Sequence, residues 1–246
     1  MLLHHYDPHT TTPLVPGHEF TGVVTETGPE VTTFATGDRV AVGNIVDSCG
    51  TCAMCRAGQQ NFCHSFPTLT YGGTDRQDGS TTLGGLGHLA VKLAVALGAT
   101  TTVLSRTKDK RDDAHRLGAH DLIDSTDTRQ LATARDTFDV VIDTISAPHD
   151  LAPYLKLVAM DGTLSLLGHL GAVTVEATDL LIGRKKLSSA GSAGRPATAE
   201  MLQFCADNTI AADIEVLPSA RLDTALDRLR RNDVRYRFVL DLSDLD

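Results

Sequence analysis

Tryptophan is absent from the 246 residues, and aromatic residues make up only 4% of the chain. This scarcity argues against a surface on which nucleic-acid bases or sugars stack. Long apolar runs are also missing, since none approaches the ~20 residues that a membrane span needs. The first residues, Met1 to Asp7, lack the basic start and the apolar stretch of a signal peptide. We therefore expect a cytoplasmic protein that does not enter a membrane.

The chain also lacks an excess of positive charge. Asp and Glu number 31 against 22 Lys and Arg, which gives a net charge of −9. A nucleic-acid partner needs a cationic footprint for its phosphates, so we expect none. Apolar residues make up 41% of the chain and charged residues 22%, which is ordinary for a globular protein. The length allows one large domain or two modest ones.

Cysteine is concentrated in one segment, where Cys49, Cys52, Cys55 and Cys63 follow the spacing C-x2-C-x2-C-x7-C. Four thiolates complete the tetrahedral shell of a structural Zn²⁺ site, and the polar segment around them would depend on a metal for its order. The alternatives are two disulfides, which need an oxidising compartment, and an iron–sulfur cluster, whose common ferredoxin spacings differ. We predict structural zinc. Cys205 lies alone in an apolar helical pattern, which predicts a buried core thiol.

The first 80 residues are rich in Thr, Gly, Pro and Val and show short strand-like alternation. Residues 20–28 predict a strand that ends in a turn, and residues 37–42 predict a turn followed by a strand. Residues 66–82 have the Gly, Thr, Asp and Ser content of a linker. This part of the chain therefore predicts a β domain that contains the cysteine segment.

From residue 83 onwards, strand patterns alternate with helix patterns. Such alternation predicts a mostly parallel sheet covered by helices on both faces. The predicted helices are 87–97, 108–117, 197–206 and 222–229, and the predicted strands are 100–104, 120–123, 138–143, 162–168, 186–191, 214–217 and 237–240.

A glycine-rich loop opens the first of these helices: Leu83, Gly84, Gly85, Leu86 and Gly87. Glycines there let the backbone approach a pyrophosphate at the helix N-terminus, although Thr stands where the full fingerprint has its first Gly.

The next strand ends near the ribose of a bound dinucleotide, where an acidic residue selects NAD. Here Ser105 and Arg106 follow the strand, and Lys108 and Lys110 come shortly after. A hydroxyl and several cations suit a 2′-phosphate, which favours NADP(H). The alternative is a solvated, cationic start of a helix.

Several motifs together resemble one family, the zinc-dependent medium-chain alcohol dehydrogenases. The resemblance is to the branch of cinnamyl alcohol dehydrogenases and bacterial NADPH-dependent aldehyde reductases. The motifs are Pro16-Gly17-His18-Glu19, Gly37-Asp38-Arg39-Val40, Asp47-Ser48-Cys49-Gly50 with its cysteine segment, Gly84-Gly85-Leu86-Gly87-His88-Leu89-Ala90, Val103-Leu104-Ser105-Arg106 and Asp233-Val234-Arg235-Tyr236-Arg237-Phe238-Val239.

The resemblance implies an α/β fold, with a Rossmann-type parallel sheet and a GroES-like β domain that carries a zinc lobe. It implies a truncated GroES-like domain over residues 1–80 with the lobe at 49–63. A cofactor domain would follow at 81–212, and a tail at 213–246 would return to the first domain. The implied activity is hydride transfer between NADP(H) and a small alcohol or aldehyde, with zinc as the Lewis acid. A homodimer through Rossmann edge strands is also expected.

The resemblance also assigns residues to roles. His18 and Glu19 belong to the catalytic zinc site, in addition to the four cysteines of the structural site. The glycine-rich loop holds the pyrophosphate, and Ser105, Arg106 and Lys110 hold the 2′-phosphate. Gly168 and Gly191 lie near the nicotinamide.

The chain departs from the family pattern in its catalytic zinc site and in its sheet. No Cys precedes Cys49, and the family's first and third catalytic ligands have no counterpart. Roughly ninety family residues, including the first Rossmann strand, are missing before Gly85. That strand is central to the sheet, so it is either lost or replaced by residues 70–83. Candidate substitutes for the lost zinc ligands are His4, His5, His9 and His64.

Three hypotheses follow. The first is an NADP(H)-dependent alcohol dehydrogenase or aldehyde reductase that retains activity. The second is a non-catalytic remnant that binds zinc and cofactor, and the third is a truncated product without a settled function.

Overall fold

The computed structural model describes residues 19–69, 88–106, 110–145, 148–168, 171–230, 233–234 and 236–245. Its contacts divide the chain into two compact units. One unit comprises Met1–Gly85 with Ser192–Asp246, and the other is Leu86–Gly191. The cofactor domain is predicted to continue to residue 212, whereas residues 192–212 cluster here with the first unit. The domain boundaries at residues 80 and 212 stay predictions.

The first unit begins with a β-hairpin that matches the predicted strands. β1 (Phe20–Val23) runs antiparallel to β2 (Arg39–Val42). The connection closes through Gly37, whose φ of +96° suits glycine, and its N–H donates to the Val24 carbonyl at 2.8 Å. All four residues of β1 are exposed. The hairpin therefore buries little surface of its own.

The cysteine segment is closed at its base by a second antiparallel pair, β3 (Ile45–Asp47) with β4 (Thr68–Leu69). Helix α2 (Ala53–Arg56) and the 3₁₀ turn η1 (Gln60–Phe62) lie between these strands. The prediction of a linker from residue 66 is wrong at β4, because the strand is only two residues long and escapes a periodicity argument. Residues 70–82 of that predicted linker lie outside the described residues.

The rest of the first unit contains α8 (Arg195–Asp207), β10 (Ile214–Pro218), the 3₁₀ turn η3 (Ser219–Arg221), α9 (Leu222–Arg230) and β11 (Arg237–Asp241). β10 and β11 are parallel, and α9 lies in the long connection that a parallel pair needs. The prediction of a buried thiol at Cys205 is wrong. Cys205 is partly exposed, and α8 buries none of its residues completely.

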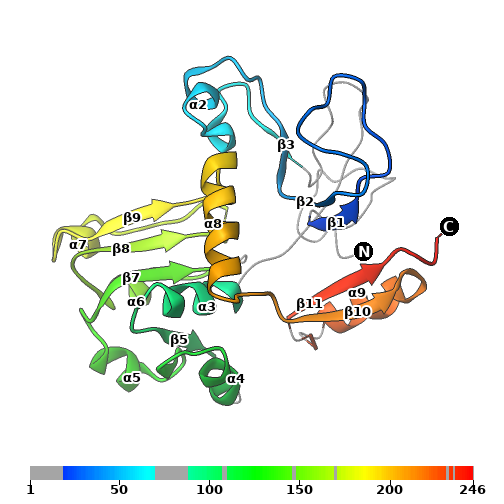
Figure 1. The fold of residues 1–246 in the computed structure, drawn as a ribbon. Helices are drawn as coiled ribbons and strands as arrows, with labels where there is room; N and C mark the ends of the chain where they lie inside the picture. Colours follow the sequence, from blue (N-terminus) through cyan, green and yellow to red (C-terminus); the bar gives the residue numbers. More distant parts are fainter. Residues whose placement is uncertain are drawn as a thin grey trace. The chain divides into compact units, whose positions relative to one another are not determined.

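The second unit alternates strands and short helices, which confirms the predicted parallel arrangement (Figure 1). Three helices of four to six residues, α5 (Thr128–Thr133), α6 (Ala152–Leu155) and α7 (Ala177–Leu181), escaped prediction because each is too short for a helical period to show. In chain order the elements are α3 (His88–Ala96), β5 (Thr102–Ser105), α4 (Arg111–Arg116), β6 (Asp121–Asp124), α5 (Thr128–Thr133), β7 (Phe138–Asp143), α6 (Ala152–Leu155), β8 (Val158–Leu166), α7 (Ala177–Leu181) and β9 (Lys186–Ser189).

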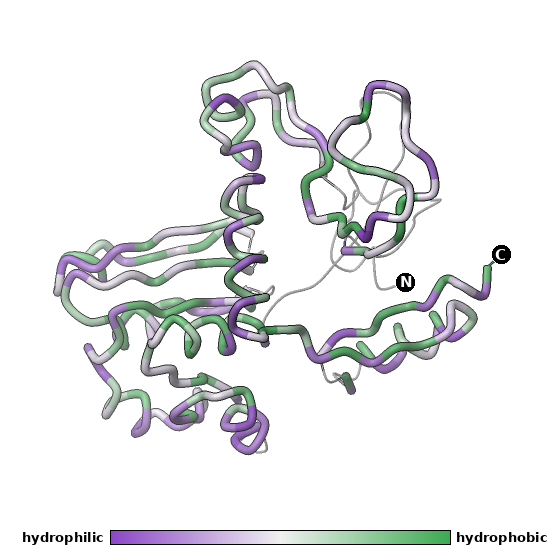
Figure 2. Tube along the Cα trace, viewed as in Figure 1, coloured by the Kyte–Doolittle hydropathy of each residue, from purple (hydrophilic) through white to green (hydrophobic). Residues whose placement is uncertain are grey.

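The main core of this unit lies where α6 packs on β7 and β8. Figure 2 shows hydrophobic residues along β7 and α3 and mostly hydrophilic residues on α4. The residues of the core cluster are Val141, Leu151, Leu155, Leu157, Val158 and Leu164. Among the described residues, none of the helices has both the length and the apolar character that a bilayer span requires.

The parallel sheet of the second unit is divided in two. β5 pairs with β6, and β7 pairs with β8, which pairs with β9. Within the described ranges, no strand joins β5 to β7. An open groove of about 1140 Å³ is lined by residues before β5 and at its start, by β6, by α5 and by the first residues of β7. Residues 70–83, the possible replacement for the central first strand, lie outside the described residues, so the loss or replacement of that strand stays a prediction.

The amino end of the sheet is held by a buried lysine. The ammonium of Lys185 donates to Asp136 at 2.6 Å and to the Leu155 carbonyl at 2.9 Å, and the Lys185 side chain is 4% exposed. The hydrogen bond from Lys185 holds the pKa of the Asp136 carboxyl below its ordinary value. The pair therefore stabilises the fold at neutral pH, and this contribution is lost as the pH falls through that lowered pKa.

Asp136→Ala is expected to lower the free energy of unfolding by about 2 kcal/mol, because the buried ammonium would lose its charged partner. The half-exposed position of Asp136 keeps the effect below that of a fully buried pair. Urea unfolding at pH 7 measures the difference. Arg129→Ala is the control, because the Arg129 side chain is 91% exposed and its pair with Asp127 should contribute little. Equal midpoints for the two variants would contradict the assignment.

Candidate functional site

Four cysteine thiols meet in the lobe between β3 and β4. The Sγ atoms of Cys49, Cys52, Cys55 and Cys63 all lie within 4.8 Å of one another. Cys49 and Cys55 are separated by 3.9 Å between sulfurs. Four sulfurs at 2.3 Å from a tetrahedral Zn²⁺ would lie about 3.8 Å apart. The thiols therefore have the spacing that one zinc ion needs.

The backbone of the lobe favours ionised sulfur. The N–H of Cys49 donates to Sγ of Cys63, and the N–H of Cys55 donates to Sγ of Cys52, each at 3.4 Å. The backbone N–H groups of Thr51 and Cys52 and the side chain of Cys63 lower the pKa of Cys49 to about 5. Cys49 is therefore a thiolate at neutral pH, which is the form that binds metal.

The other thiols divide by environment. A hydrogen bond from the His64 backbone, followed by one from Cys55, lowers the pKa of Cys52. Ser48 also lowers the pKa of Cys55, but burial and the thiols of Cys52 and Cys63 outweigh it, so that the net change is upward. The pKa values of Cys49 and Cys52 are thus lowered, whereas that of Cys55 is raised. A cation at the centre of the thiols would favour the ionised form of all three.

The alternatives to zinc fit less well. All four cysteines are free thiols in the structure, which argues against two disulfides. In a four-iron cluster each cysteine binds a different iron, so the sulfurs would need a wider separation than they have around one centre. The donor set fits a single tetrahedral ion.

The predicted catalytic zinc residues are only partly within the described chain. His18 lies outside the described residues. Glu19 lies next to β1, and its carboxylate forms an ion pair with Arg237 of β11. Among the described residues, the four cysteines form the only group of three or more potential ligands close enough for one ion. A metal role for His18 and Glu19 stays a prediction, and His64, a suggested substitute, is exposed.

The predicted cofactor residues lie at the carboxyl ends of parallel strands wherever the structure describes them. Ser105 is the last residue of β5, and Arg106 follows it, exposed. Lys110 immediately precedes α4 and is also exposed. The loop residues Leu83, Gly84, Gly85, Leu86 and Gly87 lie outside the described residues.

Gly168 and Gly191 each lie two residues beyond a strand, β8 and β9 respectively. Ligands of open α/β sheets bind at the carboxyl ends of the strands. The positions of the described residues are therefore compatible with their predicted roles, which stay predictions.

The loop after β8 approaches the loop after β7 closely at Gly168. A Cβ atom on Gly168 would lie 1.9 Å from the carbonyl oxygen of Ile145. The N–H groups of Leu167 and Gly168 both donate to the main-chain carbonyl of Asp143, at 2.7 and 3.2 Å. Glycine is therefore required at residue 168 for packing between the two loops.

Sequence reasoning missed two residues at this edge, Asp143 and His149. The Nε2 atom of His149 lies 3.0 Å from Oδ2 of Asp143. An aspartate that ends a buried strand pattern was the available signal, but its partner lies six residues further on in a loop. No periodicity links the two.

Comparisons with known proteins agree with this architecture. Residues 1–97 match the family model of the alcohol dehydrogenase GroES-like domain, and residues 85–207 match that of the zinc-binding dehydrogenases. The two models correspond to the predicted β domain with its lobe and to the Rossmann-type domain.

Individual relatives give the same picture. A probable cinnamyl alcohol dehydrogenase 6 from Arabidopsis thaliana is 37% identical, over 94% of this chain and 80% of its own length. The NADP-dependent alcohol dehydrogenase C 1 of Mycolicibacterium smegmatis is 36% identical, over 95% of this chain and 83% of its own. A solved cinnamyl alcohol dehydrogenase from Sorghum bicolor has a TM-score of 0.92 at 34% identity, covering 98% of this chain and 84% of that one.

The alignment with the Arabidopsis protein also bears on the missing segment. It extends over 289 positions but includes only 94% of a 246-residue chain. The relative therefore carries several tens of residues that face a gap here, fewer than the roughly ninety expected from the sequence.

Proposed function

The chain belongs to the zinc-binding alcohol dehydrogenase family of oxidoreductases, and from that membership we propose that it is an NADP(H)-dependent aldehyde reductase. The single observation that carries the proposal is the similarity to alcohol dehydrogenases over 94% of the chain. NADPH would supply a hydride to the carbonyl carbon of an aldehyde, and a proton on the oxygen would complete the alcohol. We place this reaction in the cytoplasm, with a homodimer as the expected assembly.

The residues at the carboxyl end of β5 support the choice of NADP(H). Ser105 and Arg106 stand where an acidic residue would oppose a 2′-phosphate. Lys110 adds a second exposed cation before α4. The M. smegmatis relative is named NADP-dependent.

A second candidate function is a non-catalytic protein that binds zinc and cofactor. Among the described residues no strand joins β5 to β7, which favours this candidate, because the crevice for a dinucleotide lies beside the central strand of such a sheet. Under this proposal the four-cysteine lobe keeps its structural zinc, whereas the catalytic set around His18 and Glu19 is incomplete.

The two candidates are separated by following NADPH oxidation with cinnamaldehyde and with a short-chain aldehyde, with and without added zinc. Turnover that depends on added zinc is expected for the reductase. NADPH binding without turnover by the zinc-loaded protein would support the non-catalytic candidate. A folded protein that does not bind NADPH would contradict both.

Arg106→Ala is expected to weaken NADPH binding about tenfold and to leave NADH binding nearly unchanged, because a charge-assisted bond to phosphate contributes ~1.5–3 kcal/mol. Nicotinamide fluorescence measures both affinities without interference from tryptophan, which the chain lacks. Arg116→Ala on α4 is the matched control, because Arg116 is an exposed arginine distant from the end of β5 in the sequence. Equal losses for NADPH and NADH would contradict a role in binding the 2′-phosphate.

A further inference from the structure

Asp143 connects two loops at the carboxyl end of the β7–β9 sheet. It is the last residue of β7, and its side chain is 6% exposed. One carboxylate oxygen, Oδ1, accepts the N–H of Ile145 at 2.9 Å. The main-chain oxygen of Asp143 accepts from Leu167 and Gly168, which begin the loop after β8. One residue thus holds the starts of both loops.

The remaining carboxylate oxygen of Asp143 faces His149. Nε2 of His149 lies 3.0 Å from Oδ2, and both atoms are shut off from solvent. The pair has the distance of an ion pair but not the alignment of a hydrogen bond. The imidazole also packs edge-on against Tyr154 of α6, with ring centroids 5.6 Å apart and planes at 79°. His149 is therefore held between the Asp143 carboxylate on one side and an aromatic ring on another.

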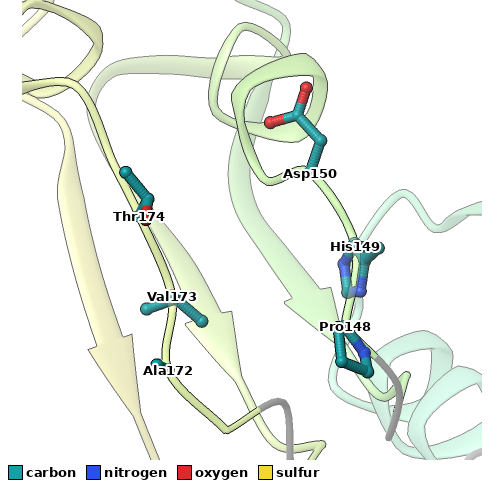
Figure 3. A pocket seen from close by; sticks show the side chains of 6 residues that line it. All are labelled: Pro148, His149, Asp150, Ala172, Val173 and Thr174. Atoms are coloured by element: carbon teal, nitrogen blue, oxygen red, sulfur yellow. The ribbon is translucent and has the colours of Figure 1, made fainter.

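An open pocket of about 430 Å³ adjoins this pair. Pro148, His149 and Asp150 line one side, and residues 172–174 of the following loop line the other, as Figure 3 shows. The pocket thus lies between the same two loops that Asp143 connects. His149 contributes both to the pocket wall and to the contact with Asp143.

The location distinguishes this contact from the ion pair of Lys185 with Asp136. Lys185 and Asp136 lie at the amino ends of β9 and β7, whereas Asp143 and His149 lie at the carboxyl end. In open α/β sheets ligands bind at the carboxyl ends of the strands. A contact that orders two loops at this edge would order the ligand-binding surface.

We propose that His149 is a positioning residue for the dinucleotide. Through Asp143 it holds the loop after β7 against the loop after β8, so that both loops present a fixed surface to the nucleotide. The identity of the ligand in this proposal rests on the proposed NADP(H) binding, whereas the contact between the two loops does not. His149 does not touch reacting atoms in this assignment.

Three variants test the assignment. His149→Phe keeps a ring beside Tyr154 and removes the ring nitrogens, whereas His149→Gln keeps a polar donor without the ring. Asp143→Asn keeps the size and the acceptor for Ile145. We expect NADPH to bind about tenfold more weakly to His149→Phe, and His149→Gln and Asp143→Asn to lie between it and the native protein. The zinc content should be the same in all four proteins.

Hydrogen exchange without nucleotide supplies the readout that does not depend on NADPH. The amides of Ile145, Leu167 and Gly168 should exchange faster in His149→Phe, whereas those in the core of β8 should not. Asp136→Ala is the control for simple destabilisation, because it weakens the opposite edge and should leave these three amides and the NADPH affinity unchanged. If His149→Phe does not fold, the same comparisons are made with His149→Gln and Asp143→Asn.

The outcomes separate the two proposals. Faster exchange at the three amides together with weaker NADPH binding supports the positioning role. Unchanged exchange overturns it, whatever the nucleotide affinity. The native protein can also fail to bind NADPH while the three amides exchange faster in His149→Phe. This result overturns the proposed function and, with it, the nucleotide as the ligand of this edge. If Asp136→Ala weakens NADPH binding as much as His149→Phe does, the positioning role is also overturned.

Discussion

Cys63→Ser is expected to reduce the zinc content from about one ion per chain to almost none. The Cys63 thiol is 6% exposed and lies within 4.8 Å of the other three sulfurs, so that its loss opens the coordination shell from within. A serine hydroxyl remains protonated at neutral pH and is a poor replacement for a thiolate. Because the lobe has few apolar contacts, zinc loss should also unfold the segment between β3 and β4.

Zinc content by atomic emission and protease sensitivity of residues 45–69 measure the two consequences together. Cys205→Ser is the matched control, since Cys205 lies on α8 and is no member of the thiol cluster. It should retain native zinc content and protease resistance. Retention of zinc by Cys63→Ser, or equal loss in both variants, would contradict a four-cysteine site.

The zinc lobe could be predicted because its information is local. Four cysteines within residues 49–63 can reach one centre through two short steps and a return loop, whatever the rest of the chain does. The structure adds what spacing does not contain, namely the backbone donors that lower the pKa of Cys49 and Cys52. These depend on the turn at Gly50, whose φ is +69°, and on the N-cap of α2 at Cys52.

The strands of the second unit were predictable to different degrees. β7 has the predicted bounds, because Phe138–Asp143 is a short apolar run with an acidic end. β8 begins at Val158, four residues before the prediction, because Asp161 and Gly162 have the composition of a turn. Asp161 has a φ of +64°, and the pairing register shifts between Phe138 and Val140. β8 therefore continues through an irregular position, at which the sequence pattern predicts the end of a strand.

The contacts between loops could not be predicted. Asp143 and His149 meet because the chain returns after β7, and Gly168 is close to Ile145 only once β7 and β8 are paired. Both contacts depend on the sheet rather than on local preference. The sequence named Gly168 through family resemblance, but the reason for a glycine there becomes visible only when the Ile145 carbonyl is in place.

Gly168→Ala is expected to disrupt the carboxyl edge of the sheet. Its Cβ would lie 1.9 Å from the Ile145 oxygen and 2.4 Å from the carbonyl carbon, distances that no side-chain rotation can relieve. One of the loops must move, so the hydrogen bonds from Leu167 and Gly168 to Asp143 would be lost together. Overpacking of this kind costs ~1–3 kcal/mol, and we expect the upper part of that range because the obstacle is backbone.

Gly191→Ala provides the matched control for this substitution. Gly191 also lies two residues beyond a parallel strand, but a Cβ there meets no atom within 4 Å. Thermal unfolding should show a lower midpoint for Gly168→Ala alone, and NADPH should bind to it more weakly than to Gly191→Ala. If neither loses stability, the close approach of the two loops is wrong, because a backbone oxygen at that distance leaves no room for a methyl group.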